Sequence, residues 1–220
     1  MSTSKAEMEE KLAWIHGRLL ESYGEPEQAA MDPIATLVCT ILSQNTNDSL
    51  RDKAFDSLRA RFPAWEQVRD APVADIVAAI RTAGLAQQKG RHIKAALQHI
   101  TAERGELNID FLAGLPVDEA RAWLTAMDGV GPKTAAIVLL FALDRPAFPV
   151  DTHVQRVSTR LGLIPKTSAE KAHVLLEALV PPVWYYPFHL NVITHGRRVC
   201  VARVPRCAAC ALAARCDFKT

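Results

Sequence analysis

Three features are missing from this chain of 220 residues, and each absence excludes a class of protein. No apolar run reaches the roughly 18 residues that a membrane-spanning helix needs, so the sequence predicts no membrane association. Residues 1–11 are polar and lack the apolar core of a signal peptide, so we expect no export and a cytoplasmic, nucleoid-associated location. No segment alternates apolar and polar residues over the length of a strand, so no β-sheet is predicted.

The net charge is also small, because 26 Lys and Arg nearly balance 24 Asp and Glu. The distribution of the charges is more informative. Residues 191–220 hold six Lys and Arg against one Asp, and a basic segment of this kind favours a nucleic-acid partner. A tail that only aids solubility has the same composition, so this segment alone leaves both interpretations open.

Apolar residues at helical spacing recur along the whole chain, and the apolar share of 49% is enough for a buried core. The clearest stripes are Leu12, Ile15 and Leu19; Ile34, Leu37, Val38, Ile41 and Leu42; and Ile93, Leu97 and Ile100. Asp32 followed by Pro33 is typical of a helix start, with Asp32 as the N-cap. The sequence therefore predicts an all-α fold.

The segment 127–135, Met-Asp-Gly-Val-Gly-Pro-Lys-Thr-Ala, joins two predicted helices by a short turn. Gly129 and Gly131 can take positive φ angles and leave the backbone bare, and Pro132 suits the first turn of the second helix. Bare backbone amides and the positive end of that helix predict a binding site for a phosphate. By itself this turn also fits non-enzymatic DNA-binding hairpins, and Lys133 by itself is an ordinary solvated lysine.

Four of the five cysteines lie close together as Cys200, Cys207, Cys210 and Cys216, with the spacing C-x6-C-x2-C-x5-C. Disulfides are not expected in a chain without an export signal. A zinc site usually takes two close cysteine pairs across a longer loop, whereas only Cys207 and Cys210 form such a pair here. Four thiolates from one compact loop are typical of a [4Fe–4S] cluster, which we predict, with zinc as the alternative.

The hairpin and the later segment 148–153, Phe-Pro-Val-Asp-Thr-His, together resemble the helix-hairpin-helix superfamily of DNA glycosylases. Members with a catalytic lysine carry it at the end of the hairpin, and an aspartate follows eighteen residues later. Lys133 and Asp151 stand at these positions, so the resemblance implies that Lys133 is the nucleophile and Asp151 its partner. Without the resemblance, Asp151 is the expected N-cap of the helix that follows it.

The cysteine spacing is similar to the cluster loop of endonuclease III and its relatives, which extends the likeness over nearly the whole chain. It implies a six-helix bundle domain over residues 33–144 that contains the hairpin. It also implies a [4Fe–4S] cluster domain formed by residues 1–32 and 145–220, with DNA held in the cleft between the domains. We expect the protein to act as a monomer.

The resemblance further assigns residues to DNA contact. Gly129 and Gly131 of the hairpin and Arg203 and Arg206 of the cysteine loop are implied to contact the phosphate backbone, where each contact steepens the salt dependence of binding. Leu85 matches the side chain that fills the space left by a flipped nucleotide. Without the family, Leu85 reads as an ordinary core leucine.

A second filling residue is expected in the segment 43–48, Ser-Gln-Asn-Thr-Asn-Asp, where relatives carry a Gln. Here Gln44 stands one place early and the shorter Asn45 occupies the expected position, so both are candidates. Pro132 also replaces an Arg that many relatives have in the hairpin. The shorter Asn45 affects the expected contact with the orphaned base, and Pro132 removes one possible phosphate contact.

The resemblance implies a bifunctional base-excision-repair glycosylase and AP lyase that removes oxidised pyrimidines such as thymine glycol. The chemistry is a Schiff base on Lys133 followed by β-elimination, on a nucleotide flipped out of the duplex. The expected partner is double-stranded DNA with a damaged base or an abasic site. Two alternatives stay open: a thymine glycosylase for G·T mismatches with the same fold, and an iron–sulfur DNA-binding protein with weak catalysis.

Overall fold

The computed structural model describes residues 4–28 and 31–218 of the chain. Within these residues every regular element is helical, so the predicted all-α fold is confirmed. None of the described helices is long and apolar enough to cross a bilayer. The chain divides into two compact units: Ala30–Arg145, and Met1–Ala29 together with Pro146–Thr220.

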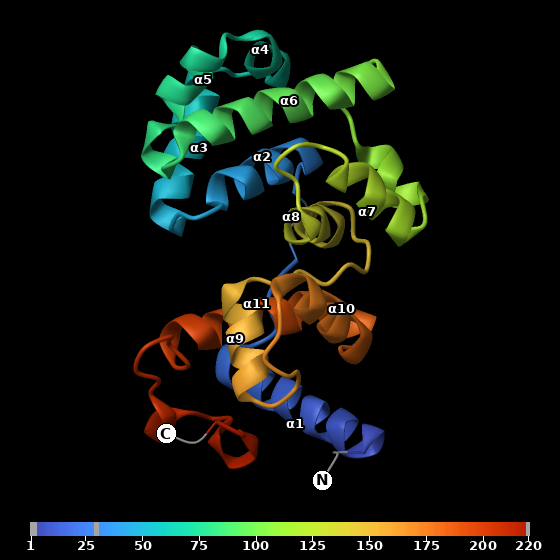
Figure 1. Ribbon diagram of the computed structural model, residues 1–220, viewed down its shortest axis with the longest axis vertical. Coiled ribbons are helices and arrows are strands. Elements are labelled where there is room, and N and C mark those ends of the chain that lie inside the picture. Colours follow the sequence, from blue (N-terminus) through green and yellow to red (C-terminus); the bar gives the residue numbers. More distant parts are fainter. Residues whose placement is uncertain (1–3, 29–30, 219–220) are drawn as a thin grey trace. The chain divides into compact units, whose positions relative to one another are not determined.

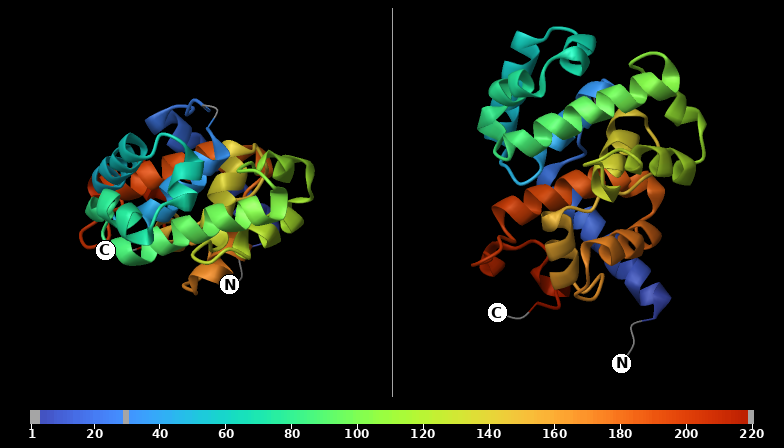
Figure 2. Two further views of the ribbon diagram at one scale, coloured as in Figure 1. Left: turned by 90° about the horizontal axis from the view of Figure 1, so that it is seen from above. Right: turned by 45° about the horizontal axis from the view of Figure 1, so that its top comes forward.

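The unit Ala30–Arg145 is a bundle of helices around α6 (Ala86–Arg104), the long green helix of Figure 1. The other helices are α2 (Pro33–Ser43), α3 (Asp48–Arg61), α4 (Trp65–Asp70), α5 (Val73–Ala79), α7 (Val117–Thr125) and α8 (Pro132–Ile137). Helices α4 and α5 pack against α6 and stay beside it in both views of Figure 2. Ile93, Leu97 and Ile100 on α6 are fully buried, as their spacing predicts.

Helix α2 provides the central apolar face of this unit, because all five residues of its predicted stripe are buried. Its start is also as predicted: the Asp32 carboxylate accepts a hydrogen bond from the Ala35 amide, and Pro33 occupies the first turn. Helix α2 packs against α3, α6 and α8. It therefore joins the hairpin helix to the rest of the bundle.

The second unit combines both ends of the chain as α1 (Lys5–Tyr23), α9 (Thr152–Arg160), α10 (Ala169–Leu179) and α11 (Tyr185–Arg198). Helices α1 and α9 pack against α11, and the predicted stripe of α1 is buried. The Asn191 side chain donates to the Gly24 carbonyl at 3.0 Å, and the Tyr186 hydroxyl donates to the Glu27 carbonyl at 2.8 Å. The two ends of the chain thus share one core.

Candidate active site and cysteine loop

The hairpin between α7 and α8 is a tight turn closed by a hydrogen bond from the Val130 amide to the Met127 carbonyl. Gly129 uses the freedom of glycine and has φ +80°, whereas Gly131 is extended with φ −90°. A Cβ atom at Gly129 would lie 2.2 Å from Nδ1 of His92. Met127 and Val130 are buried on either side of the turn, so the turn is anchored by packing and leaves no room for a side chain at Gly129.

Lys133 is the second residue of α8 and is half-buried. Pro132 opens the helix, as the sequence predicts. The residues that follow, Thr134 to Ala136, are buried and hold α8 against the bundle. Among the described residues, no hydrogen bond or ion pair engages the Lys133 amine.

Asp151 belongs to the terminal unit and is the N-cap of α9. Its Oδ1 atom accepts a hydrogen bond from the Val154 amide at 2.7 Å, so the simple interpretation of Asp151 as a helix cap is confirmed. Among the described residues, Oδ2 accepts no hydrogen bond. The carboxylate is therefore fixed in orientation by one oxygen while the other stays open to a proton or a cation.

Two loops of the central unit carry the candidate filling residues. Leu85 has φ 48°, ψ 31°, and 54% of its surface is exposed, so the interpretation of Leu85 as a core leucine is wrong. Asn45 is exposed and also has a positive φ of 52°. Gln44 is half-buried and points into the fold, where Nε2 donates to the Gly129 carbonyl at 2.9 Å. Of the two candidates, Asn45 is the accessible one, whereas Gln44 is hydrogen-bonded to the hairpin; contact of either residue with DNA stays a prediction.

The four clustered cysteines line one largely apolar pocket of the terminal unit, together with Val157, Leu161, His195, Val199 and Phe218. Cys200 Sγ accepts a hydrogen bond from Arg160 Nη1 at 3.3 Å, and Cys210 Sγ lies 3.5 Å from His195 Nε2. Burial raises the pKa of Cys210 and Cys216, and the neighbouring cysteines raise it further. The thiolate forms of Cys210 and Cys216 are therefore unfavourable unless positive charge lies close to them.

Arg156 and Arg160 of α9 form hydrogen bonds with backbone carbonyls at the end of α11 and the start of the cysteine loop. Arg156 donates to the carbonyls of Gly196 and Cys200 at 2.8 Å and 3.1 Å. Arg160 donates to the carbonyls of Val201 and Ala202 at 2.8 Å each. Because few helical hydrogen bonds order this loop, guanidinium groups satisfy its backbone instead.

His195 is buried beneath the same pocket and is one of the residues that the sequence did not single out as functional. Its Nδ1 atom lies 3.0 Å from the Tyr23 hydroxyl, and burial lowers the pKa of His195 to about 4. The ring is therefore neutral at physiological pH, with one nitrogen toward Tyr23 and the other toward Cys210. Only a folded structure reveals this chain of contacts, since Tyr23 and Cys210 are far apart in sequence.

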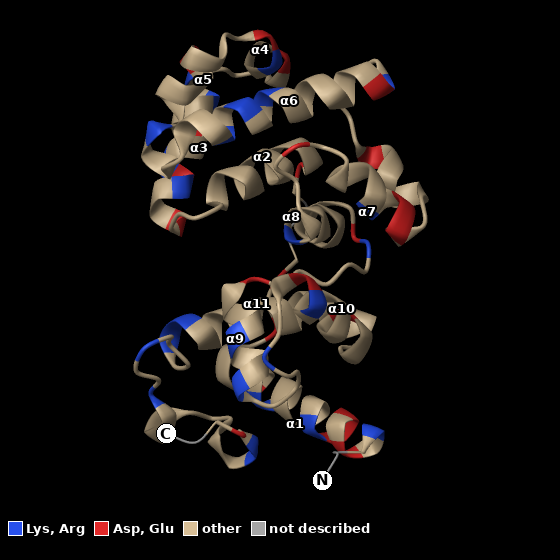
Figure 3. Cartoon of the chain, viewed as in Figure 1, with Lys and Arg blue, Asp and Glu red and all other residues tan. Residues whose placement is uncertain are grey.

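Lys and Arg residues recur at the end of α11 and along the loop that follows, where the cartoon of Figure 3 is blue. Arg203 and Arg206 of this loop are exposed, and among the described residues neither forms an ion pair. The exposed Val204 lies between them. Both guanidinium groups are thus accessible, and Arg206 also lines the cysteine pocket; their contact with DNA stays a prediction.

Comparison with known proteins shows which family the chain resembles. A family model for HhH-GPD superfamily base excision DNA repair proteins matches residues 38–182. Endonuclease III of Thermotoga maritima is 32% identical over 187 residues, covering 85% of this chain and 84% of that protein. A candidate DNA glycosylase of Arabidopsis thaliana is 40% identical over 178 residues, or 80% of this chain, and the match spans 60% of that relative.

Solved structures give the same result over a larger share of the chain. A trapped covalent intermediate of endonuclease III with DNA superposes with a TM-score of 0.82 at 26% identity. The superposition covers 98% of this chain and 96% of that one. Both units thus have counterparts in a protein that has been captured bound covalently to DNA.

Proposed function

Because the chain belongs to the HhH-GPD superfamily of base excision DNA repair proteins, we propose that it is a DNA N-glycosylase with AP lyase activity. Its proposed substrates are oxidised pyrimidines such as thymine glycol, in double-stranded DNA. The observation that carries the proposal is the unengaged amine of Lys133 at the start of the hairpin helix, in a chain similar to an endonuclease III trapped covalently on DNA.

In the proposed reaction, the neutral Lys133 amine attacks C1′ of the damaged nucleotide. The bond to the base breaks, the base leaves with the electron pair and takes up a proton, and opening of the sugar ring gives a Schiff base. The iminium acidifies the proton on C2′, and its removal expels the 3′ phosphate and nicks the strand. Oδ2 of Asp151 is the proposed acceptor for the proton of the attacking amine.

A damaged base inside a duplex is out of reach of any side chain, so the nucleotide must first leave the helix. The exposed Leu85, with the exposed Asn45 on a neighbouring loop, is suited to fill the space that the nucleotide vacates. Leu85 keeps a left-handed backbone that costs a non-glycine residue of order 1 kcal/mol or more. An apolar side chain held exposed at that cost supports a role as the inserted wedge.

The cysteine loop is proposed to hold a [4Fe–4S] cluster through Cys200, Cys207, Cys210 and Cys216. These residues surround a shared pocket, but no three His, Cys, Asp or Glu side chains among the described residues are arranged to bind a single metal ion. The spacing C-x6-C-x2-C-x5-C favours a cluster over zinc, since a zinc site usually takes two close cysteine pairs and only Cys207 and Cys210 form one here. When bound, the cluster braces a loop that otherwise has little apolar core.

The function is tested by borohydride trapping on three duplexes that carry an abasic site, thymine glycol or a G·T mismatch. We expect a covalent adduct with the abasic and thymine glycol duplexes, because both lead to a Schiff base on the enzyme. Trapping on the mismatch instead of thymine glycol would identify a thymine glycosylase. Binding to all three duplexes with no adduct and no released base would identify a binding protein and contradict the proposal.

A further prediction concerns the cluster. Protein purified without oxygen is expected to be brown, with broad visible absorbance and iron and sulfide in equal amounts. Cys207→Ser is expected to lose most of the iron, because one of four ligands is missing. Cys39→Ser is the matched control, since Cys39 lies outside the loop on α2. A colourless preparation that contains zinc and one that keeps its iron after Cys207→Ser would each contradict the assignment.

A further inference from the structure

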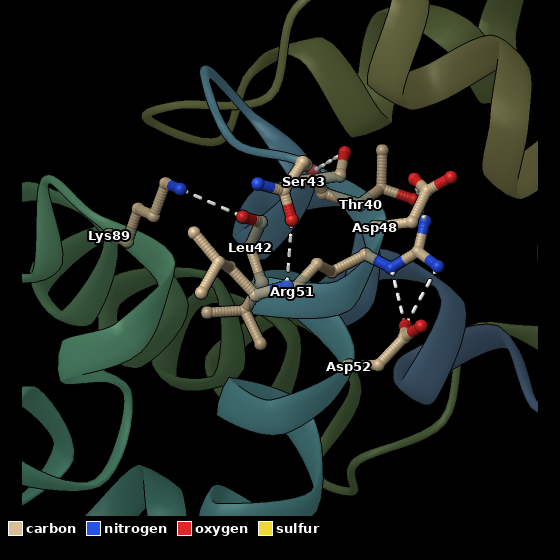
Figure 4. Close-up of polar contacts among 9 residues, drawn as sticks. Thr40, Leu42, Ser43, Asp48, Arg51, Asp52 and Lys89 are labelled. Atoms are coloured by element: carbon tan, nitrogen blue, oxygen red, sulfur yellow. Dashed lines mark hydrogen bonds and ion pairs between the residues drawn. The ribbon is translucent and has the colours of Figure 1, made fainter.

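Lys89 is a buried lysine in the first turn of α6, with 2% of its surface exposed. Its ammonium group donates to the Leu42 carbonyl at 2.7 Å and to the Ala83 carbonyl at 2.8 Å. Figure 4 shows the side chain reaching across to Leu42 at the end of α2. Lys89 occupies the position before Ile93 on the buried stripe of α6, where an apolar residue is the rule.

A buried ammonium group is unfavourable unless hydrogen bonds replace the water that it loses. Burial lowers the pKa of Lys89, and no acidic side chain offsets that effect. Two backbone carbonyls therefore provide the compensation. In return, the ammonium group ties together two segments that are 41 residues apart in sequence, at Leu42 and Ala83.

Both segments lead directly into the candidate filling loops. Leu42 is followed within three residues by Asn45, and Ala83 is followed within two by Leu85. Asn45 and Leu85 each have a positive φ, 52° and 48°. Such conformations persist only where the surroundings hold them, and the Lys89 ammonium group lies at the base of both loops.

The same contact extends to the hairpin. Gln44, next to Asn45, donates to the Gly129 carbonyl. Lys89, Leu42, Gln44 and Gly129 therefore form a continuous series of contacts within one unit, from the Leu85 loop through the end of α2 to the turn before Lys133.

We propose that Lys89 is a positioning residue, which holds the Asn45 and Leu85 loops together so that both can fill the space left by an extruded nucleotide. This inference rests on the proposed function and extends it to lesion recognition. The Lys89 side chain does not contact DNA in this role. Its effect is on the discrimination between damaged and intact duplexes.

The test uses Lys89→Met in the full-length protein, because methionine keeps an unbranched apolar stem and removes the donors. Lys94→Met is the matched control: Lys94 lies on the same helix and donates to the carbonyl of Ala71, outside the candidate loops. The DNA carries tetrahydrofuran, a stable abasic analogue that cannot form a Schiff base. 2-Aminopurine opposite the analogue reports on the orphaned position by its fluorescence.

We expect Lys89→Met to bind undamaged DNA as the native protein does, but to lose about tenfold of its preference for the abasic analogue. Its 2-aminopurine signal should differ from the native one, while Lys94→Met matches the native protein in both. Amide hydrogen exchange should become faster over residues 43–50 and 82–88 in Lys89→Met alone. Lys89→Gln, which keeps neutral donors, should fall between native and Met, and it replaces Lys89→Met if the latter does not fold.

Unchanged lesion preference and unchanged exchange in both loops would overturn the inference. A general rise in exchange across the whole unit would also overturn it, since Lys89 would then contribute only to stability. If the native protein itself shows no preference for the analogue, the proposed function fails instead. Hydrogen exchange in the two loops still decides in that case whether Lys89 holds them.

Discussion

Lys133→Gln is expected to abolish borohydride trapping and strand nicking while DNA binding stays within about twofold of the native value, or roughly 0.4 kcal/mol. Glutamine has a similar length but no nucleophilic amine, so the Schiff base cannot form. The expected loss of rate is ~10⁴-fold or more, beyond ~5 kcal/mol of barrier. No other group in the hairpin can replace an amine at C1′.

The structure also predicts that this variant folds normally. Lys133 is only half-buried, and among the described residues its amine has no partner to lose. Substitutions at such positions usually change stability by about 0.5 kcal/mol or less. Lys53→Gln is the control, because Lys53 is an exposed lysine of the same unit, on α3. Nicking by Lys133→Gln at the native rate would remove Lys133 from the mechanism.

Asp151→Asn is expected to lower the single-turnover rate of base release by about 10²- to 10⁴-fold, the usual range for a general base. The structure makes this substitution unusually informative. The Asp151 side chain caps α9 through Val154, and asparagine caps helices as well as aspartate does. The variant therefore removes the proton acceptor and keeps the cap.

Asp151→Ala separates the two roles, because alanine removes both the acceptor and the cap. We expect Asp151→Ala to lose about 1 kcal/mol of unfolding free energy, whereas Asp151→Asn melts close to the native temperature. Their rates of base release should be equally low. A normal rate in Asp151→Asn together with a destabilised Asp151→Ala would show that the carboxylate acts only as a helix cap.

The sequence predicts the fold class well where a helix has a long apolar stripe. The stripes of α1, α2 and α6 can be recognised because each spans several helical turns, and the residues of all three are buried in the structure. It does not reveal α4, since six residues make too few turns for a period to show. The π-helical turn Val138–Ala142 is hidden for another reason: its residues are apolar on every side.

Some features of the candidate site can likewise be predicted from the sequence, and others cannot. Gly129 follows from the needs of a tight turn, whereas Gly131 looks identical in sequence and proves to be extended. Lys89 did leave a signal, because it stands at the start of the stripe Ile93, Leu97 and Ile100, where a charged residue is out of place. The hydrogen-bond partners of Lys89 could not be predicted from the sequence, since backbone carbonyls of distant segments carry no sequence pattern.

The pairing of the two chain ends in one unit also bears on how the protein is made. The unit Ala30–Arg145 is continuous in sequence, so all of its residues are synthesised before Pro146. Helix α1 is synthesised first but packs on α11, which begins at Tyr185. At ~5–20 residues per second, Leu12, Ile15 and Leu19 stay without their partner for roughly 8–30 s. Helix α1 is therefore the segment of the nascent chain on which a chaperone would have the most time to act.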